Sequence, residues 1–372
     1  MRPLEGIRVL DFSTLLPGPL ATLMLAEAGA EVFKIERPPA GDEMRAYSPK
    51  VGRDSLAFAQ LNRGKRSVAL DLKQEGALKR LLPLLRSADV LLEQFRPGVM
   101  ERLGLGYEAV KSINPKLIYC SLTGYGRSGP KADKAGHDLN YIAESGLLSL
   151  LLRDGGAPIL PPALIADIGA GAYPAVINVL LGLQARAVGG KGCHIDISMH
   201  DNVLPFLFSA VGEGLGLQRW QRPGRELATG GSPRYNVYRT CDGHFIAAAP
   251  LEQKFWSTFC EHIGLPEVLR DDSKDPAASM AGVSRAIGAH TAEHWRQVFR
   301  GVDACVSVVA TLEQALSDAH YRHRGVFSHI VASDEGAMPA APLPIHAIFR
   351  EPPEELGYPR LGEANDLLDH SE

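Results

Sequence analysis

The sequence predicts an α/β protein with a large, doubly wound, Rossmann-like parallel-sheet domain and a smaller α+β domain. Through the first half of the chain, short apolar strand-like runs alternate with helical patterns. Later, two strand-like runs flank an Asp242–Gly243 dipeptide, which is typical of a β-hairpin. The length of 372 residues also exceeds that of one ordinary compact core. Together these observations favour two domains.

The N-terminus predicts a βαβ unit. The run IRVLDF (7–12) indicates a short buried strand, and a helical pattern follows from Leu20 to Glu27. Gly29 ends this helix, and EVFKIE (31–36) forms a second strand. Two strands joined by a crossover helix imply a parallel sheet.

The same alternation continues through the rest of the predicted large domain, 1–217. The expected elements are a strand SVALDL, a Leu- and Arg-rich helix up to about Ala88, a strand VLLEQF, a short helix after Pro97, a strand LIYCSLTG, a small-residue helix from Asp167 to Ala187, a strand HIDIS (194–198) and a helix NVLPFLFSAVGEGLG.

The second half begins with a polar, Gly- and Arg-rich linker at 218–232. The runs YNVYRT and HFIAAA form the predicted hairpin, which opens a small α+β domain at 233–331. The Pro-rich last stretch, 332–372, is predicted to return to the large domain.

Composition excludes several classes of partner. The net charge of -4 provides no general attraction to nucleic acid or to an anionic membrane. The five cysteines show no CxxC pair and no partner histidine at metal-ligand spacing, so we expect no metal site and a reducing compartment. The N-terminal residues lack the pattern of a signal peptide, and no uncharged apolar stretch reaches membrane-spanning length. We therefore expect a cytoplasmic protein.

The βαβ unit does not carry a dinucleotide site. Glu36 ends the second strand where a ribose-binding acid would lie. The loop STLLPG (13–18), however, replaces the GxGxxG that close approach to a pyrophosphate requires, and no GxxxxGK[ST] motif occurs. Arg37 and Arg96 follow strands and would instead grip phosphates at the carboxyl edge of the sheet. The alternative is that these bases are scattered on a solvated surface.

Three ionisable residues are candidate catalytic groups. His137 lies near the start of a helix that Asp138 would cap, where the helix dipole favours a neutral imidazole. Asp167 lies between apolar and small residues, which predicts partial desolvation beside room for a substrate. Glu252 follows a buried strand and opens a helix. The ordinary alternatives are a hydrogen-bonded loop histidine, an N-cap aspartate and a first-turn glutamate.

Several long motifs in a fixed order resemble the family III CoA-transferases. They are LEGIRVLDFSTLLPGPLATLMLAEAGAEVFKIERP, LNRGKRSVALDLK, RPGVMERLGLGYE, LIYCSLTGYGRSGP and, in the small domain, YNVYRTCDGHFIAAA. The resemblance covers nearly the whole chain. It implies an interlocked homodimer, with each active site between the large domain of one subunit and the small domain of the other. Coenzyme A would be part of the substrate rather than a resident cofactor, and its phosphates would meet Arg37, Lys65, Arg66 and Arg96.

Within this family, three segments are similar to the racemases that act on 2-methylacyl-CoA thioesters. AGHDLNY and ADIGAG match the segments that carry the two catalytic bases, here His137 and Asp167, and APLEQKFW matches one with an active-site glutamate, here Glu252. The resemblance implies racemisation or epimerisation of the α-carbon by two-base proton transfer through an enolate, a reaction of lipid metabolism. We add the hypothesis that the backbone N–H of Asp138 binds the thioester oxygen.

Two other functions remain open. In a CoA-transferase of the same fold, Asp167 would attack the acyl-CoA to form a mixed anhydride, with no required part for His137 or Glu252. A non-catalytic CoA-thioester binding protein would need neither base. The acyl group is not specified, because apolar residues in 147–158 and 218–232 would suit a fatty, sterol-derived or aryl-propionyl chain equally.

Overall fold

The computed structural model describes residues 1–152, 156–333, 335–350 and 355–368. The chain divides into two compact units. The large unit comprises Met1–Ser145, Pro161–Phe206 and His323–Glu372, and the small unit comprises Gly146–Leu160 and Leu207–Arg322. The second unit thus begins at Leu207 rather than at the predicted 233, it includes a segment near 150, and it ends before the predicted 331.

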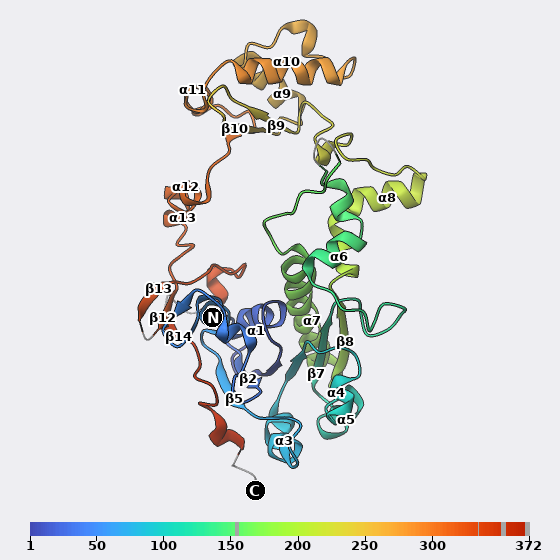
Figure 1. Cartoon of the computed structure of the whole chain (residues 1–372), viewed down its shortest axis with the longest axis vertical. Helices are drawn as coiled ribbons and strands as arrows, with labels where there is room; N and C mark the ends of the chain where they lie inside the picture. Colours follow the sequence, from blue (N-terminus) through green and yellow to red (C-terminus); the bar gives the residue numbers. More distant parts are fainter. Residues whose placement is uncertain (153–155, 334, 351–354, 369–372) are drawn as a thin grey trace. The chain divides into compact units, whose positions relative to one another are not determined.

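A six-stranded parallel sheet forms the centre of the large unit (Figure 1). Its strand order is β5-β2-β1-β6-β7-β8. The early strands β2 and β5 lie on one side of β1 and the later strands on the other, so the strand order reverses between β1 and β6. This order confirms the predicted parallel sheet. The strands are β1 (Arg8–Phe12), β2 (Glu31–Glu36), β5 (Arg66–Ala69), β6 (Val90–Glu93), β7 (Ile118–Thr123) and β8 (Cys193–Ser198).

Helices cover both faces of this sheet. On one face lie α1 (Pro17–Glu27) and α7 (Tyr173–Gly189), which also pack against each other. On the other face lie α3 (Ala77–Ser87) and α5 (Tyr107–Ile113), over a core that includes Leu10 and Phe12. Because side chains alternate along a strand, Asp11 faces α1 instead and bonds to its Thr22.

Two predicted helices have different bounds in the structure. The first helix begins at Pro17 rather than Leu20, since proline is well suited to the first turn, where its missing N–H leaves no bond unmade. The helix predicted over Asp167–Ala187 is divided into a π-helical segment, η3 (Ile165–Ala172), and α7. π-Helical turns are rare in proteins, but those that do occur are often found at functional sites.

The small unit contains the predicted hairpin. Strands β9 (Asn236–Arg239) and β10 (Phe245–Ala248) pair in antiparallel fashion, and β11 (Val306–Val308) extends the sheet. Trp256 and Phe259 are fully buried against this sheet. The α-helices of this unit are α8 (Phe208–Leu217), α9 (Gln253–His262), α10 (Pro276–Gly288), α11 (Ala292–Val298), α12 (Leu312–Leu316) and α13 (Ala319–His323), the last of which ends at the boundary with the large unit.

The C-terminal stretch packs in the large unit. Strands β12 (Ile330–Ser333), β13 (Gly336–Pro339) and β14 (Glu355–Gly357) form a small sheet, which meets α2 (Leu56–Asn62) through Phe58, Val331 and Tyr358. Residues 351–354 and 369–372 of this stretch lie outside the described residues, as do 153–155 of the segment predicted to line an acyl channel.

Within the part of the chain that the structure describes, one helical run is long and apolar enough, by length and composition alone, to cross a membrane. It is Ile165–Gly189, the combination of η3 and α7. In the structure this run packs against β7, β8 and α1 of the large unit, and it carries Asp167.

Candidate active site

A cavity of about 430 Å³ lies at the carboxyl ends of the central strands of the large unit. In a doubly wound sheet this edge, beside the point where strand order reverses, is the usual position of a ligand. The cavity is lined by residues that follow β1, β6, β7 and β8, together with residues of α6 (Asp138–Glu144) and η3: Leu15, Leu16, Pro17, Gln94, Phe95, Arg96, Pro97, Leu122, Thr123, Gly124, Ala132, Lys134, Ala135, Gly136, His137, Asn140, Tyr141, Asp167 and Met199.

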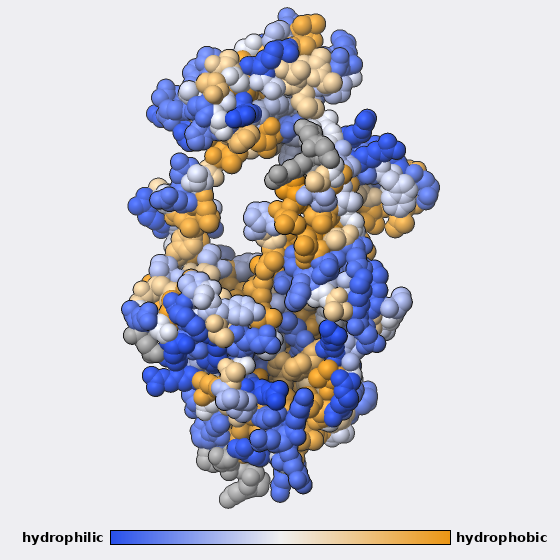
Figure 2. Space-filling view, in the orientation of Figure 1, coloured by the Kyte–Doolittle hydropathy of each residue, from blue (hydrophilic) through white to orange (hydrophobic). Residues whose placement is uncertain are grey.

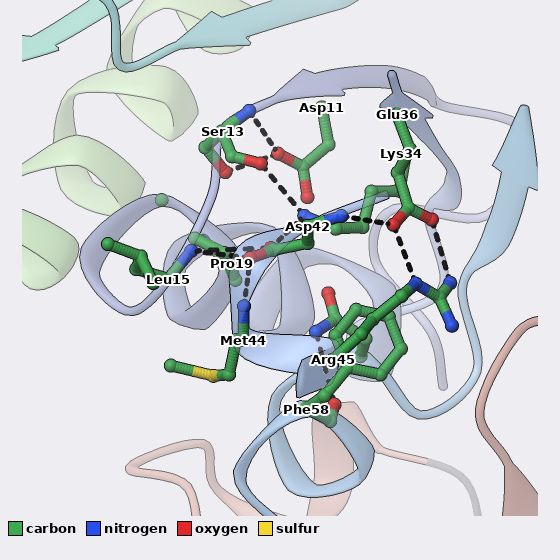
Figure 3. Close-up of polar contacts among 12 residues, drawn as sticks. Asp11, Ser13, Leu15, Pro19, Lys34, Glu36, Asp42, Met44, Arg45 and Phe58 are labelled. Atoms are coloured by element: carbon green, nitrogen blue, oxygen red, sulfur yellow. Dashed lines mark hydrogen bonds and ion pairs between the residues drawn. The ribbon is translucent and has the colours of Figure 1, made fainter. Parts of the chain in front are cut away.

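The wall that follows β1 is held by buried charges (Figure 3). Leu15 has φ of 63°, which is unusual for a branched side chain, and its N–H donates to both carboxylate oxygens of Asp42 at 3.2 Å. Lys34 Nζ donates to the carbonyl of Ser13 at 2.8 Å and pairs with Asp42 at 2.9 Å. The loop 13–17 is therefore held in place by its hydrogen bonds to the buried ionic side chains of Asp42 and Lys34.

Asp11 lies beneath the same loop. It is completely buried and accepts hydrogen bonds from Ser13 and Thr22. Burial opposes its charge, but Lys65 and Lys34 hold the pKa of Asp11 down at about 2. The carboxylate is therefore ionised at all physiological pH values, and it is fully paired.

His137 occupies the cap position at the start of α6 and lines the cavity with an exposed side chain. Its backbone N–H donates to Asn140 Oδ1 at 3.0 Å. The prediction that Asp138 caps this helix is wrong, because Asp138 is already the first helical residue and its carboxylate is engaged elsewhere. The predicted location of the imidazole near a helix N-terminus is confirmed.

Asp167 lines the same cavity from η3 and is half-buried. It is the third residue of the π-helical segment rather than an N-cap. Burial raises the pKa of Asp167 to about 6, and the neighbouring charge of Asp138 acts in the same direction, while His137 acts against it. A carboxyl group with such a pKa accepts and returns protons near neutral pH.

Tyr141 brings two glycines close to the cavity wall. Its hydroxyl donates to the carbonyl of Gly136 at 2.6 Å. A Cβ atom at Gly136 would lie 2.7 Å from the Tyr141 ring, and one at Gly124 would lie 2.5 Å from its hydroxyl oxygen. Both positions therefore exclude a side chain, and the ring of Tyr141 fixes the loop that leads to His137.

Glu252 lies in the small unit, at the residue before α9. Its side chain is exposed and makes no capping bond to the helix. It is not among the described residues that line the cavity of the large unit. A role for Glu252 in catalysis thus stays a prediction.

The predicted phosphate-binding residues fall into different environments. Arg96 lines the cavity and is exposed. Arg37 is exposed after β2, with Nε 3.7 Å from Asp71. Arg66 lies outside the cavity and pairs with Glu31, the first residue of β2, at 3.0 Å. Only Arg96 therefore combines a positive charge, exposure and contact with the cavity among these three.

Lys65 does not fit its predicted role. Its side chain is fully buried, and Nζ contacts Asp11 at 3.1 Å, Thr22 at 2.8 Å and Asn62 at 2.9 Å. Burial lowers the pKa of Lys65 to about 8, although Asp11 acts in the opposite direction. The prediction that Lys65 meets CoA phosphates is wrong, because the sequence pattern does not distinguish a buried ammonium from an exposed one.

Glu36, like Lys65, is a charged residue whose partners lie inside the protein. It accepts two bonds from Arg45, each of 2.8 Å, and one from Ser67 at 2.6 Å. The acid at the end of β2 is thus part of a buried ion pair. This agrees with the conclusion from the loop 13–18 that no ribose-binding acid is needed here.

Sequence reasoning missed Gln94, Asn140, Tyr141 and Lys134, all of which line the cavity. Gln94 Oε1 accepts the N–H of Gly18 at 3.0 Å and so joins the end of β6 to the start of α1. Gln94 lies inside the predicted strand VLLEQF, whereas the observed strand β6 ends at Glu93 and leaves Gln94 in the loop that follows. Among the described residues, no group of three or more His, Cys, Asp or Glu side chains is arranged to hold a metal ion.

The chain belongs to CoA-transferase family III, whose family model matches residues 4–365. It is 36% identical to human alpha-methylacyl-CoA racemase over 349 residues, which cover 92% of this chain and 86% of the relative. It is also 34% identical to acetyl-CoA:oxalate CoA-transferase of Acetobacter aceti, over 98% of this chain and 95% of the relative. Its relatives are enzymes of both kinds.

The fold agrees with this assignment. The crystal structure of Rv3272 from M. tuberculosis superimposes with a TM-score of 0.85, covers 99% of each chain and is 30% identical. A CAIB/BAIF family protein from Brucella suis has a TM-score of 0.83 at 26% identity. The family predicted from the sequence motifs is therefore confirmed.

Proposed function

We propose that this protein inverts the α-carbon of 2-methylacyl-CoA thioesters, with His137 and Asp167 as the two bases. One base removes the α-proton, and the electrons of the C–H bond move into the thioester carbonyl to give an enolate. The conjugate acid of the other base returns a proton to the opposite face. The observation that carries this proposal is that both ionisable side chains line one cavity, and that the pKa of Asp167 is raised to about 6.

The same cavity suits a thioester of coenzyme A. Arg96 supplies a guanidinium at its edge, and we assign this residue, with Arg37 as a more distant candidate, to the CoA phosphates. Coenzyme A enters as part of the substrate, and we infer that no resident cofactor is needed. The backbone N–H of Asp138, in the first turn of α6, has no intrahelical acceptor and is our candidate donor to the thioester oxygen.

We also propose that the chain acts in the cytoplasm and that it forms a homodimer, as the resemblance to its family implies. Hydrophobic side chains are exposed along α7, among them Ile177 at 56%, Leu181 at 61% and Val188 at 84%. Figure 2 shows hydrophobic surface over this part of the large unit. Light scattering on the purified protein should give twice the chain mass; a monomer at micromolar concentration contradicts the dimer.

In such a dimer, we propose that Glu252 of one subunit acts with His137 of the other. The variant Glu252→Gln should then lower turnover.

The experiment that tests the reaction uses one enantiomer of a 2-methylacyl-CoA in deuterated water, without an acceptor acid. We expect deuterium at the α-carbon and inversion of its configuration, followed by NMR and chiral chromatography. Asp167→Asn should slow inversion by about 10³-fold. If folded protein incorporates no deuterium at the α-carbon, the proposal is overturned.

A CoA-transferase is the second candidate, because the relatives include acetyl-CoA:oxalate and succinyl-CoA:glutarate CoA-transferases. In that reaction the Asp167 carboxylate attacks the thioester carbonyl, the C–S bond breaks and the CoA thiolate leaves. The thiolate then attacks the Asp167 carbonyl of the acyl-enzyme anhydride and releases the donor acid, which leaves an enzyme–CoA thioester. An acceptor carboxylate takes over the CoA by the same two steps in reverse. Formation of a new CoA ester only when oxalate, succinate or glutarate is added would favour this candidate.

A further inference from the structure

Hydrogen bonds to the side chain of Asp138 connect α6, which His137 precedes, to the π-helical segment that carries Asp167. Asp138 Oδ1 accepts the N–H of Ala166 at 2.7 Å and the N–H of Asp167 at 2.9 Å. Asp138 is itself only 6% exposed. One buried carboxylate oxygen therefore holds the backbone at one candidate base, while its own backbone follows directly on the other.

We propose that the side chain of Asp138 is a positioning residue that fixes Asp167 relative to His137 and places a second carboxylate beside that of Asp167. This inference rests on the proposed use of Asp167, but it holds whether Asp167 is a base or a nucleophile. It concerns the side chain and is separate from the role given to the Asp138 backbone N–H.

The positioning part follows from the local backbone. A π-helical segment has poorer internal hydrogen bonding at its start than an α-helix, and the N–H groups of its first residues have no partner within it. Asp138 supplies an acceptor to two of these groups at once. Without that acceptor, the N-terminal turn of η3 and the Asp167 side chain lose their tie to α6.

The electrostatic part follows from like charges. A carboxylate bonded to the N–H of Asp167 lies close to the Asp167 carboxyl group, and two adjacent negative charges favour protonation of one of them. His137 acts in the opposite direction. The other charged or titratable groups on the elements packed against η3 are Tyr141 and Glu144 on α6, Glu27 at the far end of α1, Tyr173 and Arg186 on α7, and Cys193, His194 and Asp196 on β8. Glu144 forms ion pairs with Lys131 and Lys134.

Most of these other groups are engaged elsewhere. Tyr141 bonds to Gly136, and Glu27 pairs with Arg63. Arg186 pairs with Asp89, His194 bonds to Ser121, and Asp196 accepts the N–H of Arg127. Among the described residues, Asp138 is the one acid whose charge raises the pKa of Asp167.

Two variants of Asp138 separate the two parts. Asp138→Asn keeps an oxygen that can accept both N–H groups but removes the charge, whereas Asp138→Ala removes both. The matched control is Asp133→Asn, which removes the same charge from an exposed residue of the loop before His137 that does not line the cavity.

The first measurement is independent of activity. Carboxyl-labelled aspartate is titrated by ¹³C NMR, and the Asp167 signal is assigned by its loss in Asp167→Asn. We expect the pKa of Asp167 to fall by about one pH unit in Asp138→Asn, with little change in the control. An unchanged pKa in a folded Asp138→Asn protein would overturn the electrostatic part, whatever reaction the enzyme performs.

The second measurement is turnover against pH. In Asp138→Asn the acid limb of kcat should move to lower pH, with a smaller loss at its optimum than in Asp138→Ala. In Asp138→Ala we expect a further fall in kcat of about tenfold to a hundredfold, because a misplaced base reacts slowly. Equal losses in both variants, with the limb unmoved, would contradict positioning by an acceptor oxygen. If none of the proteins exchanges an α-proton, the proposed racemisation fails while the NMR titration still decides this inference.

Discussion

The carboxylate of Asp11 and the carboxyl group of Asp167 lie in one unit of the protein but in opposite electrostatic environments. Asp11 is buried beside Lys65 and Lys34, and its pKa is held at about 2. Asp167 has an acid beside it, and its pKa is raised to about 6. The comparison teaches that the carboxylate beneath the cavity wall is kept ionised by two lysines, whereas the carboxyl group that lines the cavity lies beside another acid.

The largest effect we expect is on activity. Asp167→Asn and His137→Gln should each lower the rate of α-carbon inversion by about 10³-fold, in the range that removal of a general base produces. Circular dichroism should show intact folds, because neither residue is part of the buried ion pairs. If either variant lowers the rate of inversion by less than tenfold, that residue is not one of the catalytic bases.

The paired region should respond through stability instead. Lys65→Met leaves Asp11 buried with one cation fewer, and we expect the free energy of unfolding to fall by about 3 kcal/mol or more. Urea denaturation measures this change. The double variant Asp11→Leu with Lys65→Met should be less destabilised than the sum of the single variants, since no unpaired charge remains. Strict additivity would contradict the direct pairing of the two residues.

Asp167→Asn should also make the protein more stable near neutral pH. A carboxyl group whose pKa is raised from its ordinary value of 3.8 to about 6 destabilises the fold when it ionises. The cost develops between these two pH values and is complete above pH 6, so the variant should gain about 2 kcal/mol at pH 7.5 and nothing below about pH 4. Thermal denaturation at both pH values checks the sign. A variant less stable at pH 7.5 would contradict it.

The smallest effect concerns substrate binding. Arg96→Ala should raise KM for the CoA thioester about tenfold, the effect of losing one charge-assisted contact with phosphate. Arg66 is the matched control, because it forms a partly exposed pair with Glu31 outside the cavity. Arg66→Ala should change KM less than twofold and stability by less than about 1 kcal/mol. A larger KM effect at Arg66 than at Arg96 would reverse our assignment.

Much of the fold was predictable because its signals are local. The apolar runs at 7–12 and 31–36 and the hairpin around Asp242 correspond to real strands. The bounds near Asp167 were not, since a π-helical turn depends on how η3 packs against α1 and α6. The start of the first helix at Pro17 follows instead from the local preference of proline for the first turn. The predicted limits of the small domain differ from the compact unit for a similar reason, because the segment around 150 joins that unit through space.

The candidate site divides in the same way. His137 and Asp167 were identified by motif, and the structure places both at one cavity. Lys65 looked equally suitable in sequence but is buried under α1, which only the three-dimensional position of Asp11 explains. The hydrogen bonds from the backbone of Ala166 and Asp167 to the Asp138 side chain could not be predicted from the sequence either, because these partners lie 28 and 29 residues away from Asp138.

The most direct test of two working bases is α-deuterium incorporation measured separately from each enantiomer of one 2-methylacyl-CoA. A single remaining base can exchange the proton on its own face only. We predict that Asp167→Asn exchanges one enantiomer and His137→Gln exchanges the opposite one, while the unmodified enzyme exchanges both. Exchange of the same enantiomer by both variants, or of both enantiomers by either, would contradict two opposed bases.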